Sequence, residues 1–218
     1  TFTNLERGWS FVRAANQGLR EVAAPYACLL NNDTVLTVGW LSEMIAVAAS
    51  DPAIGLVNPS SNNFGMKTGL RGPERMAALC RRSPCARAEQ AAGSGFCLLI
   101  KKEVLDRIGL LDESYGMGFF EDTDFSFRAR EAGWRCVRAL RAYVHHRQHA
   151  TFGKKGSWLA GYVRNRERFE ARWGPRERLA VLIRKTGDSQ PLEELARTVL
   201  EALRQGAQIT LAARQEDL

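Results

Sequence analysis

The sequence has few histidines and few cysteines for its length. Of its 218 residues, 3 are His and 5 are Cys. An odd number of cysteines at irregular spacing argues against a disulfide framework. A single close pair, Cys80 and Cys85, with no histidine nearby argues against a zinc site. We therefore expect free thiols in a reducing compartment, with Cys28 and Cys97 as small core residues.

Signals for membrane insertion and secretion are also missing. No apolar run approaches the roughly 18 residues of a spanning helix. The sequence also lacks the charged, apolar and small-residue segments that together indicate a signal peptide. The chain begins at Thr1 and not at a methionine, which we interpret as a cut edge. We expect a cytoplasmic protein, with the inner face of the membrane as the alternative place.

The charge is uneven in sign, with 31 Lys and Arg against 24 Asp and Glu, a formal net charge of +7. Such an excess suits phosphate-rich ligands, anionic membranes or nucleic acid. Much of it lies in residues 154–178, where a solvated helix face is the other interpretation. No nucleic-acid recognition motif is present, and aromatic residues are not interleaved with the basic ones, so we expect no nucleic-acid partner.

Short apolar runs alternate with helical patterns, which predicts the α/β class. Helices are expected near residues 11–20, 40–49, 102–108, 124–132, 157–173 and 192–203. Strands are expected at 26–30, 54–57, 96–100, 136–140 and 143–146. Residues 60–92 lack clear periodicity, and we expect a mobile loop there.

The first polar cluster, Asn31-Asn32-Asp33-Thr34, directly follows an apolar run. In open α/β sheets, ligands bind where strands end. A carboxylate fixed there, such as Asp33, can hold a hard divalent cation on a diphosphate. An ordinary turn explains the same residues, because Asn and Asp are common in turns.

The second cluster places Glu121, Asp122 and Asp124 within four residues, among aromatic side chains. Acidic residues are favoured at a helix N-terminus, so capping explains part of the pattern. An apolar surrounding also raises the pKa of a carboxyl group, as a general base requires. Both interpretations remain open from the residues alone.

The third cluster holds all three histidines: His145, His146 and His149. Adjacent strand residues face opposite ways, so only one of the first two can point into a given site. A strand-end histidine can complete a metal site with Asp33. A solvated or hydrogen-bonded histidine is the ordinary alternative.

Taken in order, these residues resemble the large inverting family 2 glycosyltransferases, especially the bacterial branch that builds surface polysaccharides. The similarity covers roughly residues 4–175. It is carried by Asn16-Gln17-Gly18, Leu29-Leu30-Asn31-Asn32-Asp33-Thr34, Gly39-Trp40-Leu41, Gly95-Phe96-Cys97, Ile108-Gly109-Leu110-Leu111-Asp112-Glu113, the stretch Glu121 to Arg128, Gly133-Trp134, and His145-His146 followed by Thr151-Phe152.

The resemblance implies a Rossmann-like α/β domain of the GT-A type, followed by C-terminal helices. It implies sugar transfer from a nucleotide-sugar donor to a saccharide or lipid-linked acceptor. Asp122 matches the general base, with Glu121 and Asp124 in support or in contact with the acceptor. Arg128 is implied as a structural partner of these acids.

The resemblance also implies a divalent cofactor, Mn²⁺ or Mg²⁺. Asp33 matches the last acid of the family's DxD motif, while Asn31 stands at its first position and supplies no charge. His146 or His145 matches a histidine that helps hold the metal. Donor contacts are expected from Asn16, Asn31, Asn32 and Asp33.

One part of the family pattern does not appear, namely the opening strands and the Asp-rich segment that grips the nucleotide base. We therefore expect residues 1–152 to be an N-terminally incomplete catalytic region and 153–218 a helical extension. Helix 157–173 is amphipathic and basic, which predicts contact with an anionic membrane surface. The alternative function is a non-catalytic domain that keeps the fold and binds a saccharide or a protein.

Overall fold

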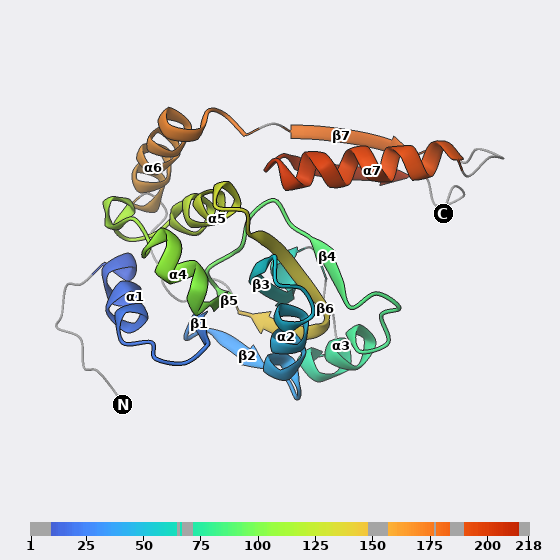
Figure 1. Ribbon diagram of the computed structural model, residues 1–218, viewed down its shortest axis with the longest axis horizontal. Coiled ribbons are helices and arrows are strands. Elements are labelled where there is room, and N and C mark those ends of the chain that lie inside the picture. Colours follow the sequence, from blue (N-terminus) through green and yellow to red (C-terminus); the bar gives the residue numbers. More distant parts are fainter. Residues whose placement is uncertain are drawn as a thin grey trace.

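The structure is a computed structural model that describes residues 10–64, 66, 72–147, 157–176, 178–183 and 190–213. In chain order the elements are α1 Phe11–Arg20, β1 Tyr26–Leu30, β2 Thr34–Leu36, α2 Trp40–Ala49, β3 Ile54–Ser60, η1 Asn62–Phe64, α3 Gly72–Cys80, β4 Arg87–Glu89, β5 Cys97–Lys101, α4 Lys102–Ile108, η3 Glu113–Tyr115, α5 Glu121–Glu131, β6 Arg135–His146, α6 Ser157–Trp173, β7 Arg178–Ile183, α7 Gln190–Arg204 and β8 Gln208–Ala213. A central sheet lies between helices, and β7, α7 and β8 extend to one side (Figure 1).

The central sheet is mixed, with the strand order β1-β5-β3-β6-β2 and β4 on another part of β6. β3 and β6 run parallel, and the remaining pairs are antiparallel. β6 is 12 residues long because its first half pairs with β3 and β4, whereas its last residues pair with β2. Because β6 is this long, His145 and His146 lie beside the end of the turn between β1 and β2.

Two hydrophobic cores cover the two faces of the sheet. Leu98 and Ile100 of β5 belong to the core formed with α1, α4 and α5, while Cys97 and Leu99 belong to the core formed with α2. This alternation is expected from the two-residue period of a strand. The α/β class is therefore confirmed, with one layer of helices on each face.

Most of the expected helices are confirmed, because their signals are local. The helices expected at 11–20, 40–49, 102–108 and 157–173 have those bounds. Ser10 caps α1, since its hydroxyl accepts a hydrogen bond from the Arg13 N–H. Gly109 ends α4 at a φ of 77°, a conformation that glycine adopts easily.

The loop expected at 60–92 is wrong for two parts of that range. α3 and β4 both lie within it. Met76, Ala77 and Cys80 bury one face of α3 against Tyr143. Gly72 and Pro73 indicated a loop at the point where the helix starts, although proline is tolerated in a first turn.

The expectation for Cys28 is also wrong, because this residue is exposed. All five cysteines are free, as expected.

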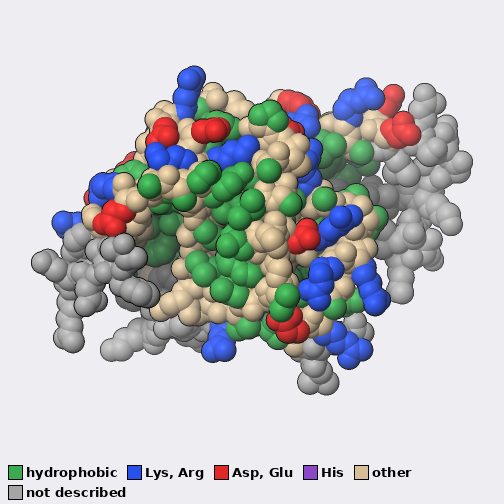
Figure 2. All heavy atoms as spheres, turned by 60° about the horizontal axis from the view of Figure 1, so that its bottom comes forward, with side chains coloured by type: hydrophobic (Ala, Val, Ile, Leu, Met, Phe, Trp, Pro, Cys, Tyr) green, Lys and Arg blue, Asp and Glu red, His purple; other side chains and the backbone are tan. Residues whose placement is uncertain are grey.

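β1 pairs with β5 on one side only and forms an edge of the described sheet. Figure 2 shows hydrophobic side chains gathered in the middle of one face of the molecule. The exposed large apolar residues of β1, β2, α2 and the turn between them are Leu30, Leu36, Val38 and Leu41.

The C-terminal part contains strands as well as the expected helices. β7 and β8 form a parallel pair connected through α7. α6 joins the main core through the fully buried Phe169. The expected boundary after residue 152 lies outside the described residues and stays a prediction. Among the helices that the structure describes, none is long and apolar enough to cross a membrane.

Candidate active site

A pocket of about 1000 Å³ opens between the polar strand ends and the start of α5. Its wall combines the ends of β1 and β6, the turn before α5, part of α6 and the segment that enters β7. Its lining includes Asn31, Asn32, Asn63, Gly95, Glu121, Asp122, Thr123, His146, Arg166, Glu170, Arg176 and Arg178. The pocket therefore brings the first and second polar clusters of the sequence together with one histidine.

The turn before α5 has an uncommon backbone. Phe119 and Phe120 have φ values of 69° and 71°, and both lie in the left-handed region that aromatic residues seldom adopt. The Asn165 side-chain amide on α6 donates to the carbonyls of Tyr115, Gly118 and Phe119, at 2.8, 2.7 and 3.3 Å. Strained residues persist where the surroundings fix them, and this often occurs at functional sites.

Asp122 is oriented by hydrogen bonds to both carboxylate oxygens. Its Oδ2 accepts from the Gly95 N–H at 2.9 Å, and its Oδ1 accepts from the Thr123 N–H at 2.7 Å and from the Thr123 hydroxyl at 3.2 Å. Burial raises the pKa of Asp122, and these hydrogen bonds oppose that rise only in part. The carboxylate is thus held in one orientation at the pocket and is a stronger base than an exposed aspartate.

Glu121 lies beside Asp122 and is almost fully buried. Its Oε2 has no hydrogen-bond partner among the described residues. Burial, and next the charge of Asp122, raise the pKa of Glu121 to about 8. At neutral pH the side chain is therefore mostly protonated and can donate a hydrogen bond into the pocket.

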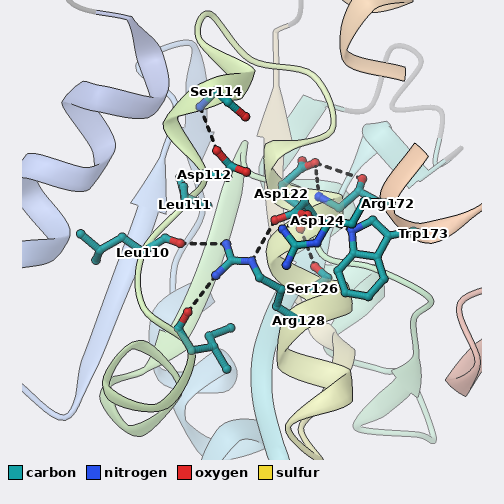
Figure 3. Close-up of polar contacts among 12 residues, drawn as sticks. Leu110, Leu111, Asp112, Ser114, Asp122, Asp124, Ser126, Arg128, Arg172 and Trp173 are labelled. Atoms are coloured by element: carbon teal, nitrogen blue, oxygen red, sulfur yellow. Dashed lines mark hydrogen bonds and ion pairs between the residues drawn. The ribbon is translucent and has the colours of Figure 1, made fainter. Parts of the chain in front are cut away.

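Asp124 was expected to support Asp122 or to contact the acceptor, and contact with the acceptor does not fit its position outside the pocket lining. Its side chain has no exposed surface, and its Oδ2 accepts from Arg128 Nε at 2.8 Å. Its Oδ1 accepts from Trp173 Nε1 at 2.8 Å and from Arg172 Nη1 at 3.2 Å (Figure 3). Asp124 joins α5 to the end of α6, which is a structural role.

Arg128 extends the same network to the segment after α4. Its Nη1 and Nη2 donate to the carbonyls of Ile108 and Leu110, at 2.9 and 2.8 Å (Figure 3). The implied role of Arg128 as a structural partner of the acids is thereby confirmed for Asp124. The network holds α5 in place without using the acids that face the pocket.

The strand register decides which histidine faces Asp33. Thr34 pairs with His146 and Val35 with His145. His146 Nε2 lies 2.9 Å from Asp33 Oδ1, whereas His145 Nδ1 lies 3.5 Å from the Tyr143 hydroxyl. His145 is thus not beside Asp33. His149 and residues 151–152, which the resemblance also used, lie outside the described residues.

The surroundings of His146 suit a cation between it and Asp33. Its Nδ1 lies 3.1 Å from Asn63 Oδ1, so both ring nitrogens face oxygen acceptors. An imidazole nitrogen and a carboxylate oxygen side by side are ordinary ligands of divalent transition metals. A cation would bind Nε2 and Asp33 while Nδ1–H donates to Asn63.

The protein supplies few metal ligands at this place. Across the described ranges, no group of three or more His, Cys, Asp and Glu side chains is arranged to hold a metal ion. Asn31 lies beside the pair, with Nδ2 3.4 Å from His146 Nε2. Asp33 and His146 would therefore be the two side chains that hold a divalent cation, and they fit a cation that takes only a few ligands from the protein.

The three asparagines expected to contact the donor are not equivalent. Asn31 and Asn32 line the pocket. Asn16 is buried outside the pocket lining, where its amide donates to the Leu111 carbonyl at 2.8 Å and accepts from the Leu111 N–H at 3.0 Å. This corrects the expectation for Asn16, which links α1 to the segment before η3.

Sequence reasoning missed the basic residues of the pocket, Arg166, Arg176 and Arg178. The charge excess of the C-terminal region was visible, but no spacing separated these three from solvated arginines. It also missed Asn165, which appeared only as a polar position in an amphipathic helix. In both cases the tertiary arrangement gives the residue its place.

Comparison with solved structures shows the fold. GalNAc-T7 in complex with UDP, GalNAc and Mn²⁺ superposes with a TM-score of 0.55 at 16% identity, over 77% of this chain and 36% of that one. The mannosyltransferase PcManGT from Pyrobaculum calidifontis, in complex with GDP-Man and Mn²⁺, gives a TM-score of 0.50 at 18% identity, over 77% and 43%. Both are GT-A glycosyltransferases, so the Rossmann-like GT-A fold is confirmed.

Sequence comparison finds relatives that are longer. The uncharacterized protein y4gI of Sinorhizobium fredii is 28% identical over 165 residues, 67% of this chain and 18% of that protein. The N-acetylglucosaminyl-diphospho-decaprenol L-rhamnosyltransferase of Mycobacterium tuberculosis is 39% identical over 70 residues, 32% of this chain and 22% of the enzyme. The chain thus spans about a fifth of the length of these relatives. The model of the glycosyltransferase-like family 2 matches residues 2–171, and the chain belongs to this family.

Proposed function

We propose that this chain catalyses sugar transfer from a nucleoside-diphosphate sugar to an acceptor hydroxyl, with inversion at the anomeric carbon and Asp122 as general base. The observation that carries the proposal is the position of Asp122. Its carboxylate faces the pocket, two neighbouring groups orient it, and burial raises its pKa. A general base needs this combination of access, orientation and basicity.

In the proposed step, Asp122 takes the proton of the acceptor hydroxyl while the hydroxyl oxygen attacks the anomeric carbon. Attack comes from the face opposite the diphosphate, so one displacement forms the new C–O bond, breaks the old one and inverts the configuration. Inverting hydrolysis has the same geometry with water in place of the acceptor. Glu121, mostly protonated, donates a hydrogen bond in the pocket and leaves Asp122 as the charged acid.

Asp33 and His146 are proposed to hold a divalent cation, with Asn31 and Asn32 near the donor. When bound, Mn²⁺ or Mg²⁺ would neutralise charge on the departing diphosphate. Support comes from the fit of the Asp33–His146 pair and from the Mn²⁺ in both similar solved structures. His145 is left out of the proposed set because it lies beside Tyr143 and not beside Asp33, and Asn16 is left out because its amide is bonded to Leu111.

The acceptor is proposed to be a saccharide or a lipid-linked saccharide. The similarity to a rhamnosyltransferase with a decaprenol-linked acceptor supports this class. The first turns of α6 expose Trp158, Leu159 and Val163, and Tyr162 on the same helix lines the pocket. Contact of α6 with a membrane surface, at the inner face of the membrane, belongs to the same proposal.

The Asp122→Asn variant tests the assignment of the base. With Mn²⁺ and a panel of nucleoside-diphosphate sugars, we expect transfer and donor hydrolysis to fall about 10²- to 10⁴-fold, the usual contribution of a general base. Asp106→Asn is the matched control, because Asp106 is an exposed acid on α4 paired with Lys102. Equal turnover in wild type and Asp122→Asn, with both folded by circular dichroism, would rule out Asp122 as the base.

A further inference from the structure

Two arginines, Arg176 and Arg178, line the pocket where the chain passes from α6 to β7. Arg176 follows the end of α6, and Arg178 opens β7. Across the described part of the chain neither forms an ion pair, and the hydrogen bonds of Arg176 are long ones to the Gly206 carbonyl, at 3.4 and 3.5 Å. By contrast, Arg166 in the same pocket is bonded to Glu170 at 2.7 Å.

Arg176 is partly buried and has charges of both signs near it. Burial lowers its pKa, the charge of Asp122 opposes that change, and the smaller effects of Arg130 and Arg178 add to it. Arg130 and Arg176 both lie against the Phe127 ring. Arg130 Nη1 is buried without a partner among the described residues. No acid that the structure describes forms an ion pair with Arg130 or Arg176, and partly buried positive charge that is not paired is unfavourable, so an anionic ligand would stabilise this arrangement.

The position of these arginines indicates which substrate carries the anion. The donor diphosphate is assigned to Asp33 and His146, on the β1–β2 turn and at the end of β6. Arg176 and Arg178 come from the other side of the fold, between α6 and β7, and Arg176 is close enough to sense the charge of Asp122. The proposed base must contact the acceptor hydroxyl, so a group beside Asp122 on this side belongs to the acceptor.

We infer that Arg176 and Arg178 form a subsite for a phosphate or diphosphate group carried by the acceptor, an assignment that rests on the proposed function. The planar guanidinium fork matches phosphate oxygens and can bind two of them at once. The same segment that connects the sheet domain to the β7–α7–β8 unit thus selects acceptors that bear such an anion.

The test is calorimetric titration of the whole chain with inorganic pyrophosphate in EDTA, where no metal-dependent binding takes place. Wild type is expected to bind. The Arg176→Gln/Arg178→Gln variant is expected to bind at least about tenfold more weakly, because charge-assisted hydrogen bonds are lost. Arg164→Gln/Arg197→Gln removes the same charge from exposed positions outside the pocket and is expected to match wild type.

Equal affinity in wild type and Arg176→Gln/Arg178→Gln would overturn the subsite. The subsite would also be overturned if pyrophosphate binding required Mn²⁺, were lost in Asp33→Asn and were unchanged by the arginine substitutions. Such pyrophosphate would occupy the donor position. Should the glutamine variant not fold, Arg176→Lys/Arg178→Lys keeps the charge and loses the fork, and it is expected to bind at an intermediate level. Arginine-dependent binding without any sugar transfer would count against the proposed function and leave the subsite standing.

Discussion

Two carboxylates in the first turn of α5 have opposite environments. Asp122 faces the pocket, and its carboxylate accepts hydrogen bonds from the Gly95 N–H and from its neighbour Thr123. Asp124 is fully buried and is bonded by Arg128, Arg172 and Trp173. Side chains that are two positions apart on a helix point about 200° apart around its axis, so Asp122 faces the pocket and Asp124 faces α6. Acids in one motif can therefore divide between chemistry and architecture.

The difference lies in their counter-charges. Asp124 is neutralised by two arginines, as a buried charge requires. Asp122 and Glu121 have none within ion-pair distance among the described residues, and the pKa of each is raised. A charge left without a partner is costly for stability but available to a substrate. The three predictions below test that contrast, beginning with the largest expected effect.

Asp124→Asn is expected to lower the free energy of unfolding by about 3–5 kcal/mol, the usual cost of removing one partner of a buried ion pair. Arg128 would then lack a counter-charge in a largely buried place. Urea denaturation measures the loss. Asp106→Asn, at an exposed pair, is the control and should change stability by no more than about 1 kcal/mol. If Asp124→Asn were fully stable yet inactive, the structural role assigned to Asp124 would be wrong.

Glu121→Gln is expected to change the pH dependence of stability. The pKa of Glu121 is raised from an ordinary 4.5 to about 8 in the folded state. Between these values the unfolded chain releases a proton that the folded chain keeps, so stability falls as pH rises, by up to about 1.4 kcal/mol per pH unit. The loss is complete above about pH 8.

Replacing this acid by glutamine removes the loss, so Glu121→Gln should gain stability over wild type as pH rises from 5 to 8. Urea denaturation at several pH values gives the difference between the two proteins. Glu131→Gln, at the exposed end of the same helix, is the matched control. Parallel stability curves for wild type and Glu121→Gln would show that Glu121 ionises normally in the folded protein.

Asp33 is an intermediate case, because its partner His146 is the side chain proposed to hold a metal with it. We expect His146→Ala to weaken Mn²⁺ binding at least about tenfold in calorimetry, through loss of one of two protein ligands. His145→Ala is the control beside it in the chain, and its affinity should not change. Equal weakening by both alanines would contradict the assignment that rests on strand register.

The sequence was sufficient for elements whose signals are local and repeated. α1, α2, α4 and α6 carry a continuous apolar face and clear ends, so their bounds followed from periodicity. α3 lies between Gly72-Pro73 and Ser83-Pro84, so its apolar face was taken for part of a loop. The length of β6 depends on three partner strands that are distant in the chain, and no local pattern contains that information.

For the candidate site, the sequence located the polar clusters but not the role of each member. Strand alternation predicted that one of His145 and His146 faces the site, and only pairing with β2 decides for His146. The acids of α5 were recognised together, but their division depends on what packs beside the helix. Arg176 and Arg178 carry no motif, so their presence in the pocket follows only from the tertiary fold.

Asn165 has a consequence for how the pocket opens. One side-chain amide on α6 binds three carbonyls of the turn that holds Phe119 and Phe120 in the left-handed region. The turn cannot relax while α6 stays docked, and α6 cannot leave without releasing the turn. We therefore expect helix and turn to open as one cooperative unit. Widening of this wall of the pocket would then follow the slow undocking of a packed helix and not the rapid motion of a free loop.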